Sequence, residues 1–228
     1  MSKLILILTF ILSLQTVIAQ NNNIDTNEKR HGIWKKTYKS GNIRYQGEFN
    51  HGKEIGIFKF YKNVASSKPY IIKEYNNSNT EAIVKFYSSK GVLETLGSMN
   101  GKNRIGRWEY YHKDGITIRI IENYLNGKLN GKYTSFYENK KPSIEAHYKN
   151  GKLDGLYKRY AVLGHVYQEL TYSNGTLNGK AIYHDRESGD IIKSGQYIND
   201  EKVGTWQIYI DGIASETKEI KPYLKKNK

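Results

Sequence analysis

The stretch "LNGKLNGKYTSFY", residues 125–137, places two turn signals directly before a run of aromatic and hydroxyl residues. A two-residue hairpin turn needs positive φ at its centre, which Asn and Gly reach at little steric cost. Closely related strings return at residues 99–111, 149–160 and 173–183. Self-similarity at a fixed interval predicts a repeat architecture.

The repeat interval is set by a glycine that precedes each aromatic-rich strand. Successive glycines of this kind lie 24, 50, 25, 24, 24 and 25 residues apart. The interval of 50 spans two repeats, with Glu81 where the missing glycine would stand, so we expect eight repeats. The glycines are Gly32, Gly56, Gly106, Gly131, Gly155, Gly179 and Gly204.

Each repeat contains two turns and therefore two strands. One turn is of the Asn-Gly type, and a second glycine-containing turn follows about half a repeat later. No segment shows a sustained helical period of apolar residues. The predicted fold is all-β: an elongated, single-layer antiparallel meander of about eight two-stranded hairpins, with a period of 24–25 residues and a twist or curve. The structural turn glycines are Gly101, Gly127, Gly151 and Gly175.

Two columns of side chains predict aromatic ladders, because strands alternate their side chains between faces. Equivalent residues of successive repeats should lie roughly 10 Å apart, so eight repeats should span about 80 Å and be stabilised by neighbouring repeats. One column stands two residues after the opening glycine: Trp34, Phe58, Ile83, Trp108, Tyr133, Tyr157, Ala181 and Trp206. The other stands two residues before the Asn-Gly turn: Phe49, Tyr75, Ser98, Tyr124, Tyr148, Tyr172 and Tyr197.

The string "YQGEFNHGKEIG", residues 45–56, resembles the MORN repeat, in which an aromatic residue is followed by regularly spaced glycines. The Tyr-x-Asn-Gly-Lys-x-x-Gly strings at residues 124–131 and 148–155 are similar to the variant found in bacterial proteins described as antitoxin components of toxin–antitoxin modules. The resemblance runs from about residue 32 to residue 223. It implies a hairpin-repeat fold and an antitoxin-like or immunity-like role. Departures that favour the bacterial variant are Trp34, Phe58, Trp108 and Trp206, where a second strand glycine is usual.

The N-terminus has the pattern of an export signal: Lys3, an apolar run over residues 4–14 and a small-residue cleavage site at residues 17–19. The apolar run is short for a membrane span, and an uncleaved anchor is the alternative. We expect a secreted or periplasmic protein. The expected divisions are a signal peptide at 1–19, a flexible segment at 20–31, the repeat array at 32–223 and a basic C-terminal tail at 224–228.

The formal net charge of +14 favours anionic partners, without choosing among lipid headgroups, acidic glycans and an acidic protein. A purely solubilising charge is the alternative. Export and the even spread of the lysines argue against nucleic acid. The sequence has no cysteine, which excludes disulfides, thiolate nucleophiles and cysteine-ligated zinc.

We expect no enzymatic activity, cofactor or metal. The six histidines follow the repeat register and do not form a ligand cluster. Glu145 and Glu169 share a column, but their expected separation of about 10 Å is at or beyond the upper limit for paired hydrolase carboxylates. Lysine is their expected partner. The glycines precede strands, whereas a phosphate loop precedes a helix.

The predicted function is an exported, non-enzymatic repeat scaffold that binds an unidentified protein or peptide. The alternative is an envelope-surface protein that binds anionic lipid or polysaccharide. For any one tyrosine, a ladder that only supports the sheet is a competing interpretation. The open strand edges also allow oligomers by edge pairing, and residues 63–72 form an irregular segment of unassigned role. The candidate binding face consists of Tyr124, Tyr148, Tyr172, Tyr197, Lys128, Lys149 and Lys152.

Overall fold

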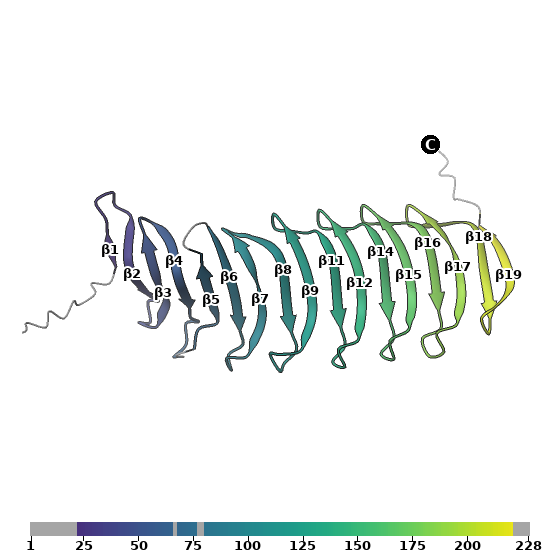
Figure 1. Cartoon of the computed structure of the whole chain (residues 1–228), viewed down its shortest axis with the longest axis horizontal. Coiled ribbons are helices and arrows are strands. Elements are labelled where there is room, and N and C mark those ends of the chain that lie inside the picture. Colours follow the sequence, from purple (N-terminus) through teal and green to yellow (C-terminus); the bar gives the residue numbers. More distant parts are fainter. Residues whose placement is uncertain (1–21, 66–67, 77–79, 221–228) are drawn as a thin grey trace, which may run out of the picture.

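The computed structural model describes residues 22–65, 68–76 and 80–220. Within these ranges the chain forms nineteen strands and no helix, and the strands make one open antiparallel sheet (Figure 1). The long strands lie side by side in chain order, with the turns along the two long edges of the sheet. The predicted fold class, an elongated all-β hairpin meander, is confirmed.

Eight long hairpins build the sheet. Three two-residue strands add to them, one at the N-terminal end of the sheet and two directly before the long strands β11 and β14. The short strands are β1 (Asn23–Ile24), β10 (Lys128–Leu129) and β13 (Lys152–Leu153). The long strands of the first four hairpins are β2 (Arg30–Thr37), β3 (Ile43–Asn50), β4 (Lys53–Phe60), β5 (Ile71–Tyr75), β6 (Glu81–Tyr87), β7 (Leu93–Asn100), β8 (Asn103–Tyr111) and β9 (Ile118–Leu125). Those of the last four are β11 (Gly131–Phe136), β12 (Pro142–Lys149), β14 (Gly155–Tyr160), β15 (Val166–Ser173), β16 (Thr176–His184), β17 (Ile191–Ile198), β18 (Glu201–Ile210) and β19 (Ile213–Ile220).

The Asn-Gly turns have the backbone conformation that their sequence predicts. Between β9 and β10, Asn126 and Gly127 have φ values of 51° and 79°. Positive φ at both central residues is the type I′ pattern, which matches the twist of the flanking strands. Gly151 and Gly175 occupy the same second position, with φ of 85° and 92°.

The turn between β7 and β8 differs from the prediction by one residue. Asn100 pairs with Asn103, so Gly101, with φ of 58°, is the first central residue, as in a type II′ turn. A shift of one residue moves the preceding strand's side chains to the opposite faces. Met99, and not the predicted Ser98, therefore packs against the buried cluster that contains Trp108.

The opening glycines mark β-bulges, and the one strand without such a glycine breaks the predicted column. Around Gly56 in β4 the pairing to β3 shifts from Glu48–Ile55 to Gln46–Lys59. Strand β6 has no glycine at its start and pairs with β5 without a register shift. The rule that the buried column lies two residues after the opening position therefore fails in β6. Ile83, two residues after Glu81, is 47% exposed, and the next residue, Val84, is fully buried instead. The prediction for Ile83 was wrong.

The buried core is formed within one layer, by large aromatic rings that lie over glycines of the neighbouring strand. Trp108 is fully buried against Gly97, where a Cβ atom would lie 2.2 Å from the indole Cδ2. The same arrangement joins Phe58 to Gly47 and Trp206 to Gly195. Only glycine permits this approach of ring to backbone.

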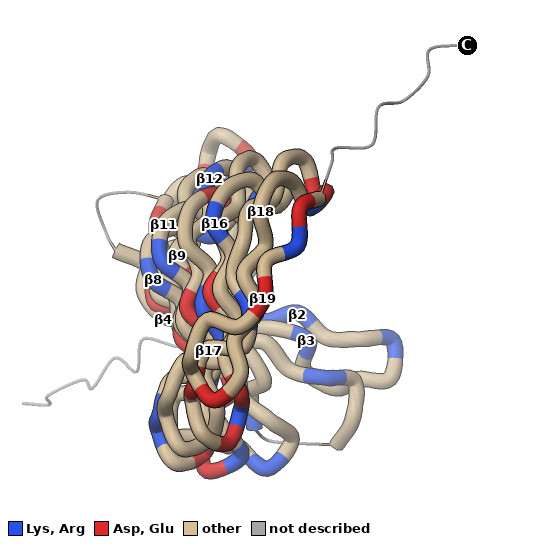
Figure 2. The backbone as a smooth tube through the Cα atoms, turned by 90° about the vertical axis from the view of Figure 1, so that its right-hand side faces the viewer, with Lys and Arg blue, Asp and Glu red and all other residues tan. Residues whose placement is uncertain are grey.

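Strand alternation gives the sheet two different faces. The face that carries Trp108 and the tyrosines is called the aromatic face below. The opposite face carries four lysine or arginine pairs with glutamate and is called the charged face: Lys85–Glu74, Arg107–Glu109, Lys132–Glu145 and Lys158–Glu169. The sheet twists along its length, so that β2 and β3 project to one side of β18 and β19 in the end view (Figure 2).

The N-terminal end of the sheet begins earlier than the predicted array. Part of the segment expected to be flexible, residues 22–31, contains β1, which pairs with β2. The Trp34 indole N–H donates to the carbonyl of Asn23 at 2.9 Å. The expected signal peptide (1–19), the last three residues of the expected array (221–223) and the expected tail (224–228) lie outside the described residues, as do residues 66–67 of the irregular segment.

Candidate functional site

The structure places the predicted tyrosines and lysines on different faces of the sheet. Tyr148 pairs with Leu153 and Lys149 pairs with Lys152, and neighbouring residues of a strand point to opposite sides. The same relation holds for Tyr124 and Lys128, because Lys128 pairs with Leu125. Lys128, Lys149 and Lys152 are exposed, whereas the tyrosines are half-buried. The predicted residues therefore do not form one surface.

Each predicted tyrosine packs its ring against an aromatic residue of the first strand of a hairpin. Ring centroids of Tyr148 and Tyr133 are 5.9 Å apart at an interplanar angle of 62°. Tyr172 and Tyr157 are 5.7 Å apart at 68°. Tyr124 and Tyr197 make the corresponding edge contacts with Trp108 and Trp206. Edge-to-face contacts of this kind add to the stability from area burial, so all four rings support the sheet.

One group on the aromatic face is a closed polar network around Glu122, here called the Arg104 cluster (Arg104, Tyr110, Glu122 and Tyr124). The Glu122 carboxylate accepts hydrogen bonds from Tyr110 at 2.6 Å and Tyr124 at 2.8 Å. The guanidinium of Arg104 donates to both tyrosine oxygens, at 2.5 Å and 3.1 Å. It also lies 4.3 Å from the centroid of the Trp108 ring.

The Arg104 cluster satisfies its own polar groups. The side chain of Glu122 is only 15% exposed, and a carboxylate at that depth needs hydrogen-bond partners. Burial and the hydrogen bond to Glu122 raise the pKa of Tyr110 far above its usual value. Burial is also the main cause that raises the pKa of Tyr124. The phenols therefore remain donors, and they are used inside the protein.

The second group, here called the tyrosine patch, consists of Tyr133, Tyr148, Tyr157 and Tyr172 on β11, β12, β14 and β15. No hydrogen bond from the hydroxyls of Tyr148, Tyr157 or Tyr172 reaches any residue that the structure describes. Burial raises the pKa of each of these three phenols, so each keeps its proton at neutral pH. The patch presents half-buried rings with hydroxyl groups available to another molecule.

A single column of residues explains the contrast between the two groups. Glu122 of β9 faces Trp108, whereas the corresponding position of β12 is Ala146, which faces Tyr133. The corresponding position of β15 is Leu170, which faces Tyr157 of β14. Ala146 and Leu170 are buried and offer no acceptor to the tyrosines beside them. The sequence prediction found Tyr133 and Tyr157 only as ladder residues and missed the role of Glu122.

The charged face is paired within itself. The lysine partners expected for Glu145 and Glu169 are confirmed: Lys132 lies 2.7 Å from Glu145 and Lys158 lies 3.0 Å from Glu169. Tyr160 also donates to Glu145 at 2.6 Å. The pKa of Glu145 is lowered, chiefly by its hydrogen bond from Lys132. These carboxylates are cross-strand partners of lysine.

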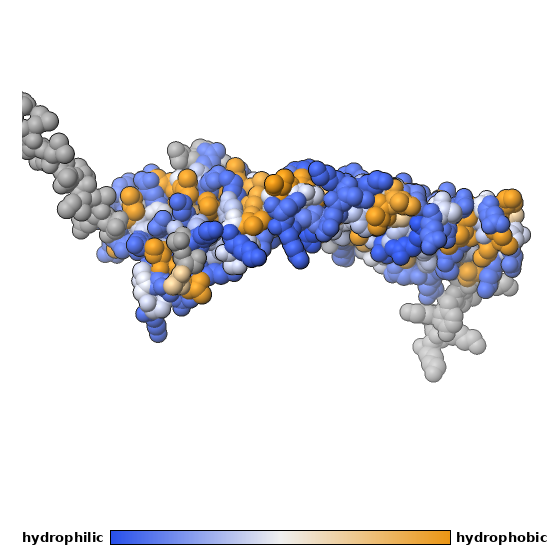
Figure 3. All heavy atoms as spheres, turned by 90° about the horizontal axis from the view of Figure 1, so that it is seen from below, coloured by the Kyte–Doolittle hydropathy of each residue, from blue (hydrophilic) through white to orange (hydrophobic). Residues whose placement is uncertain are grey.

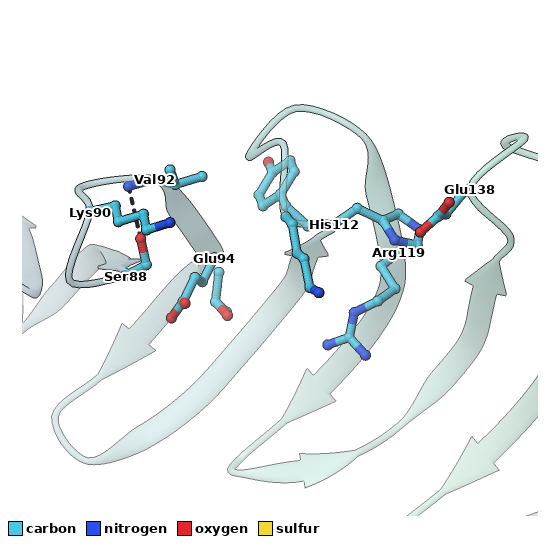
Figure 4. A pocket seen from close by; sticks show the side chains of 10 residues that line it. Ser88, Lys90, Val92, Glu94, His112, Arg119 and Glu138 are labelled. Carbon is cyan, nitrogen blue, oxygen red and sulfur yellow. Dashed lines mark hydrogen bonds between the residues drawn. The ribbon is translucent and has the colours of Figure 1, made fainter.

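A hollow of about 640 Å³ opens at one long edge of the sheet, between the loops that follow β6, β8 and β11 (Figure 4). Lys90, His112 and Arg119 line it together with Glu94 and Glu138. The Nε2 atom of His112 is buried and has no hydrogen-bond partner among the described residues. Basic and acidic side chains both line this hollow, so its charge selects no single class of ligand.

Residues 22–65, 68–76 and 80–220 contain no group of three or more histidine, aspartate or glutamate side chains placed to hold a metal ion. They also contain no helix with the length and apolar character that crossing a membrane requires. The face seen from below in Figure 1 is mostly hydrophilic, with small separate apolar areas (Figure 3). On that face, no apolar area is continuous along the molecule.

Comparison with models of known protein families, and with curated protein sequences, finds no match for this chain.

Proposed function

We propose that this chain is a non-enzymatic scaffold that binds a protein or peptide through the tyrosine patch on its aromatic face. The observation that supports the proposal is the set of three neighbouring phenols, Tyr148, Tyr157 and Tyr172, whose hydroxyls have no partner among the described residues. Elsewhere on the same face, the equivalent hydroxyl of Tyr124 is used within the protein.

The tyrosine patch has the physical properties of a protein-binding surface. Tyrosine offers a large apolar ring and a polar end, and it is enriched at interfaces. The edge contacts with Tyr133 and Tyr157 already hold the Tyr148 and Tyr172 rings in place. Binding would therefore order few side chains, which lowers its entropic cost. The hydroxyls then select partners that supply carbonyl or carboxylate acceptors.

The rest of the proposal concerns where the scaffold acts. The signal-like N-terminus favours a secreted or periplasmic site, and the resemblance to antitoxin components favours a protein partner. The net charge of +14 would assist the approach of an acidic partner. Binding of anionic lipid or polysaccharide through charge is the competing function, and it predicts binding that weakens steeply with salt.

The test removes two hydroxyls and leaves the rings in place. We expect the double variant Tyr148→Phe/Tyr172→Phe to keep the wild-type unfolding midpoint. Recovery of its partner from the envelope of the producing cells should fall about tenfold, as expected for the loss of two hydrogen bonds. Tyr45→Phe, the same change on the aromatic face outside the patch, serves as the control.

The same experiment at low and high salt separates the two functions. A protein partner that survives high salt and is lost only in the double variant supports the proposal. Retention of that partner by the double variant would contradict the role of the tyrosine patch. Recovery of only anionic lipid or glycan, at low salt alone and equally by all variants, would support the competing function.

A further inference from the structure

The two ends of the sheet differ in whether their outer strand is covered. At the N-terminal end, β1 pairs with the start of β2, and Asn22 continues the contact. The Asn22 N–H donates to the carbonyl of Ile33 at 2.8 Å, and its Oδ1 accepts from the Lys35 N–H at 2.9 Å. The outer edge of β2 is thus occupied over most of its length.

At the C-terminal end, β19 is the last strand of the sheet (Figure 1), and its pairing with β18 is the only one that the described residues give it. Every residue from Ile213 to Glu219 is exposed. Unpaired backbone N–H and C=O groups along an edge strand are a template for another strand. The strand is eight residues long, which is the usual length in this sheet.

Strand β19 has the same form as interior strands that pair on both sides. Its register to β18 shifts between Ile208 and Tyr209. The register of β12 to β11 shifts in the same way between Ser135 and Phe136, and β12 still pairs with β13 and β14 on its other edge. The irregularity in β19 is therefore compatible with a further strand.

The charges of β19 select one partner register. Glu219 already accepts a hydrogen bond from Thr205 at 2.8 Å, whereas Glu216 and Lys218 have no ion pair or hydrogen bond from their side chains to any described residue. When two copies of this strand run antiparallel with Thr217 opposite Thr217, each Glu216 faces the Lys218 of the other copy. Centring on residue 216 or 218 would instead place like charges opposite each other. Opposite charges directly across a pair stabilise it, and like charges destabilise it.

We propose that two copies of this chain associate through β19, antiparallel and two-fold symmetric about Thr217, to form one sheet twice as long. The two Glu216–Lys218 pairs fix the register, and both lie on the side of the sheet where Lys218 pairs with Trp206. Head-to-tail growth is blocked because the outer edge of β2 is occupied. The association therefore stops at a dimer.

Charge reversal tests the register. We expect the wild-type protein to sediment as a dimer. Glu216→Lys and Lys218→Glu should each weaken the dimer by about tenfold or more, because each change places like charges opposite each other twice. An equimolar mixture of the two variants should recover the dimer, and so should the double variant Glu216→Lys/Lys218→Glu. Glu187→Lys, an exposed turn residue, is the control for the change in net charge.

Cross-linking gives an independent measurement, since the chain has no cysteine of its own. A Thr217→Cys variant should form a disulfide-linked dimer on mild oxidation, because residues opposite each other in a sheet lie within disulfide range. Ser215→Cys should not, because Ser215 would face Glu219 of the other copy. A wild-type monomer at all concentrations would overturn the proposal. So would a dimer unaffected by both charge reversals, or equal cross-linking at both positions.

Discussion

The Arg104 cluster and the tyrosine patch lie on one face of the same sheet, on neighbouring hairpins of the same kind, and they differ in what their hydroxyls do. In the cluster, Tyr110 and Tyr124 donate to Glu122 beneath Arg104. In the patch, Tyr148 and Tyr172 have rings in similar positions, but their hydroxyls have no acceptor among the described residues. One acidic residue in the central column therefore decides whether a tyrosine stabilises the sheet through its hydroxyl or presents that hydroxyl to another molecule.

The largest expected effect concerns the ring beneath the Arg104 cluster. Trp108→Ala should lower the free energy of unfolding by about 3–5 kcal/mol, because a fully buried indole leaves a cavity. Tyr157→Ala in the tyrosine patch should cost clearly less, because its side chain is half-buried. Urea unfolding of both variants measures the difference. Equal losses would mean that the two regions do not differ in packing.

The next effect tests the carboxylate of the cluster. Glu122→Ala should cost about 1–3 kcal/mol, because it leaves two half-buried phenols and a guanidinium without their acceptor. Glu74→Ala removes a carboxylate from a half-exposed pair on the charged face, which should cost at most about 1 kcal/mol. Thermal and urea unfolding of the two variants give the comparison. A cost for Glu122→Ala no greater than the control would show that the network is not stabilising.

A smaller effect isolates single hydroxyls. Tyr124→Phe should lower the free energy of unfolding by about 0.5–1.5 kcal/mol, since it removes hydrogen bonds to Glu122 and Arg104. Tyr148→Phe should be neutral within about 0.5 kcal/mol, because its hydroxyl has no described partner. Equilibrium unfolding in urea resolves the two cases. A destabilising Tyr148→Phe would show that its hydroxyl has an internal partner after all.

The smallest expected effect is the loss of stability at low pH that Asp25 causes at the covered N-terminal end of the sheet. The pKa of Asp25 is lowered to about 2, first by the hydrogen bond that its carboxylate accepts from the Lys29 backbone N–H and then by the one that it accepts from the His51 side chain. A depressed folded-state pKa adds stability above the unfolded value of 3.8 that is lost as pH falls through about 2. An NMR titration of the Asp25 carboxyl should show this value. A midpoint near 3.8 would mean that these bonds do not form in solution.

Much of the fold could be predicted from the sequence because its turns require unusual backbone angles. Asn126 and Gly127 adopt the positive φ that their types allow, and the hairpin register follows. The prediction failed at Ile83 because the β6 strand lacks the glycine that forms a bulge in the other hairpins. It failed at Ser98 because the turn between β7 and β8 is displaced by one residue. Both errors are shifts of register, which local composition alone does not determine.

The candidate site was less predictable because it depends on contacts across strands. The lysines and tyrosines were grouped by their proximity in sequence, although neighbouring strand residues point to opposite faces. Tyr148 and Tyr172 were identified as candidate residues, but their difference from Tyr124 was not. That difference depends on Glu122, and the pairing of β8 with β9 is needed to place this residue beside Trp108.

Among the described residues, each long strand pairs only with strands that are close to it along the chain, and this pairing has a kinetic consequence. Strands close in sequence meet through short loops, so little loop entropy is lost before contacts form. A hairpin can dock on the previous one as soon as it leaves the ribosome, without waiting for the rest of the chain. The aromatic face can therefore be completed from one end to the other during synthesis, with β19 added last.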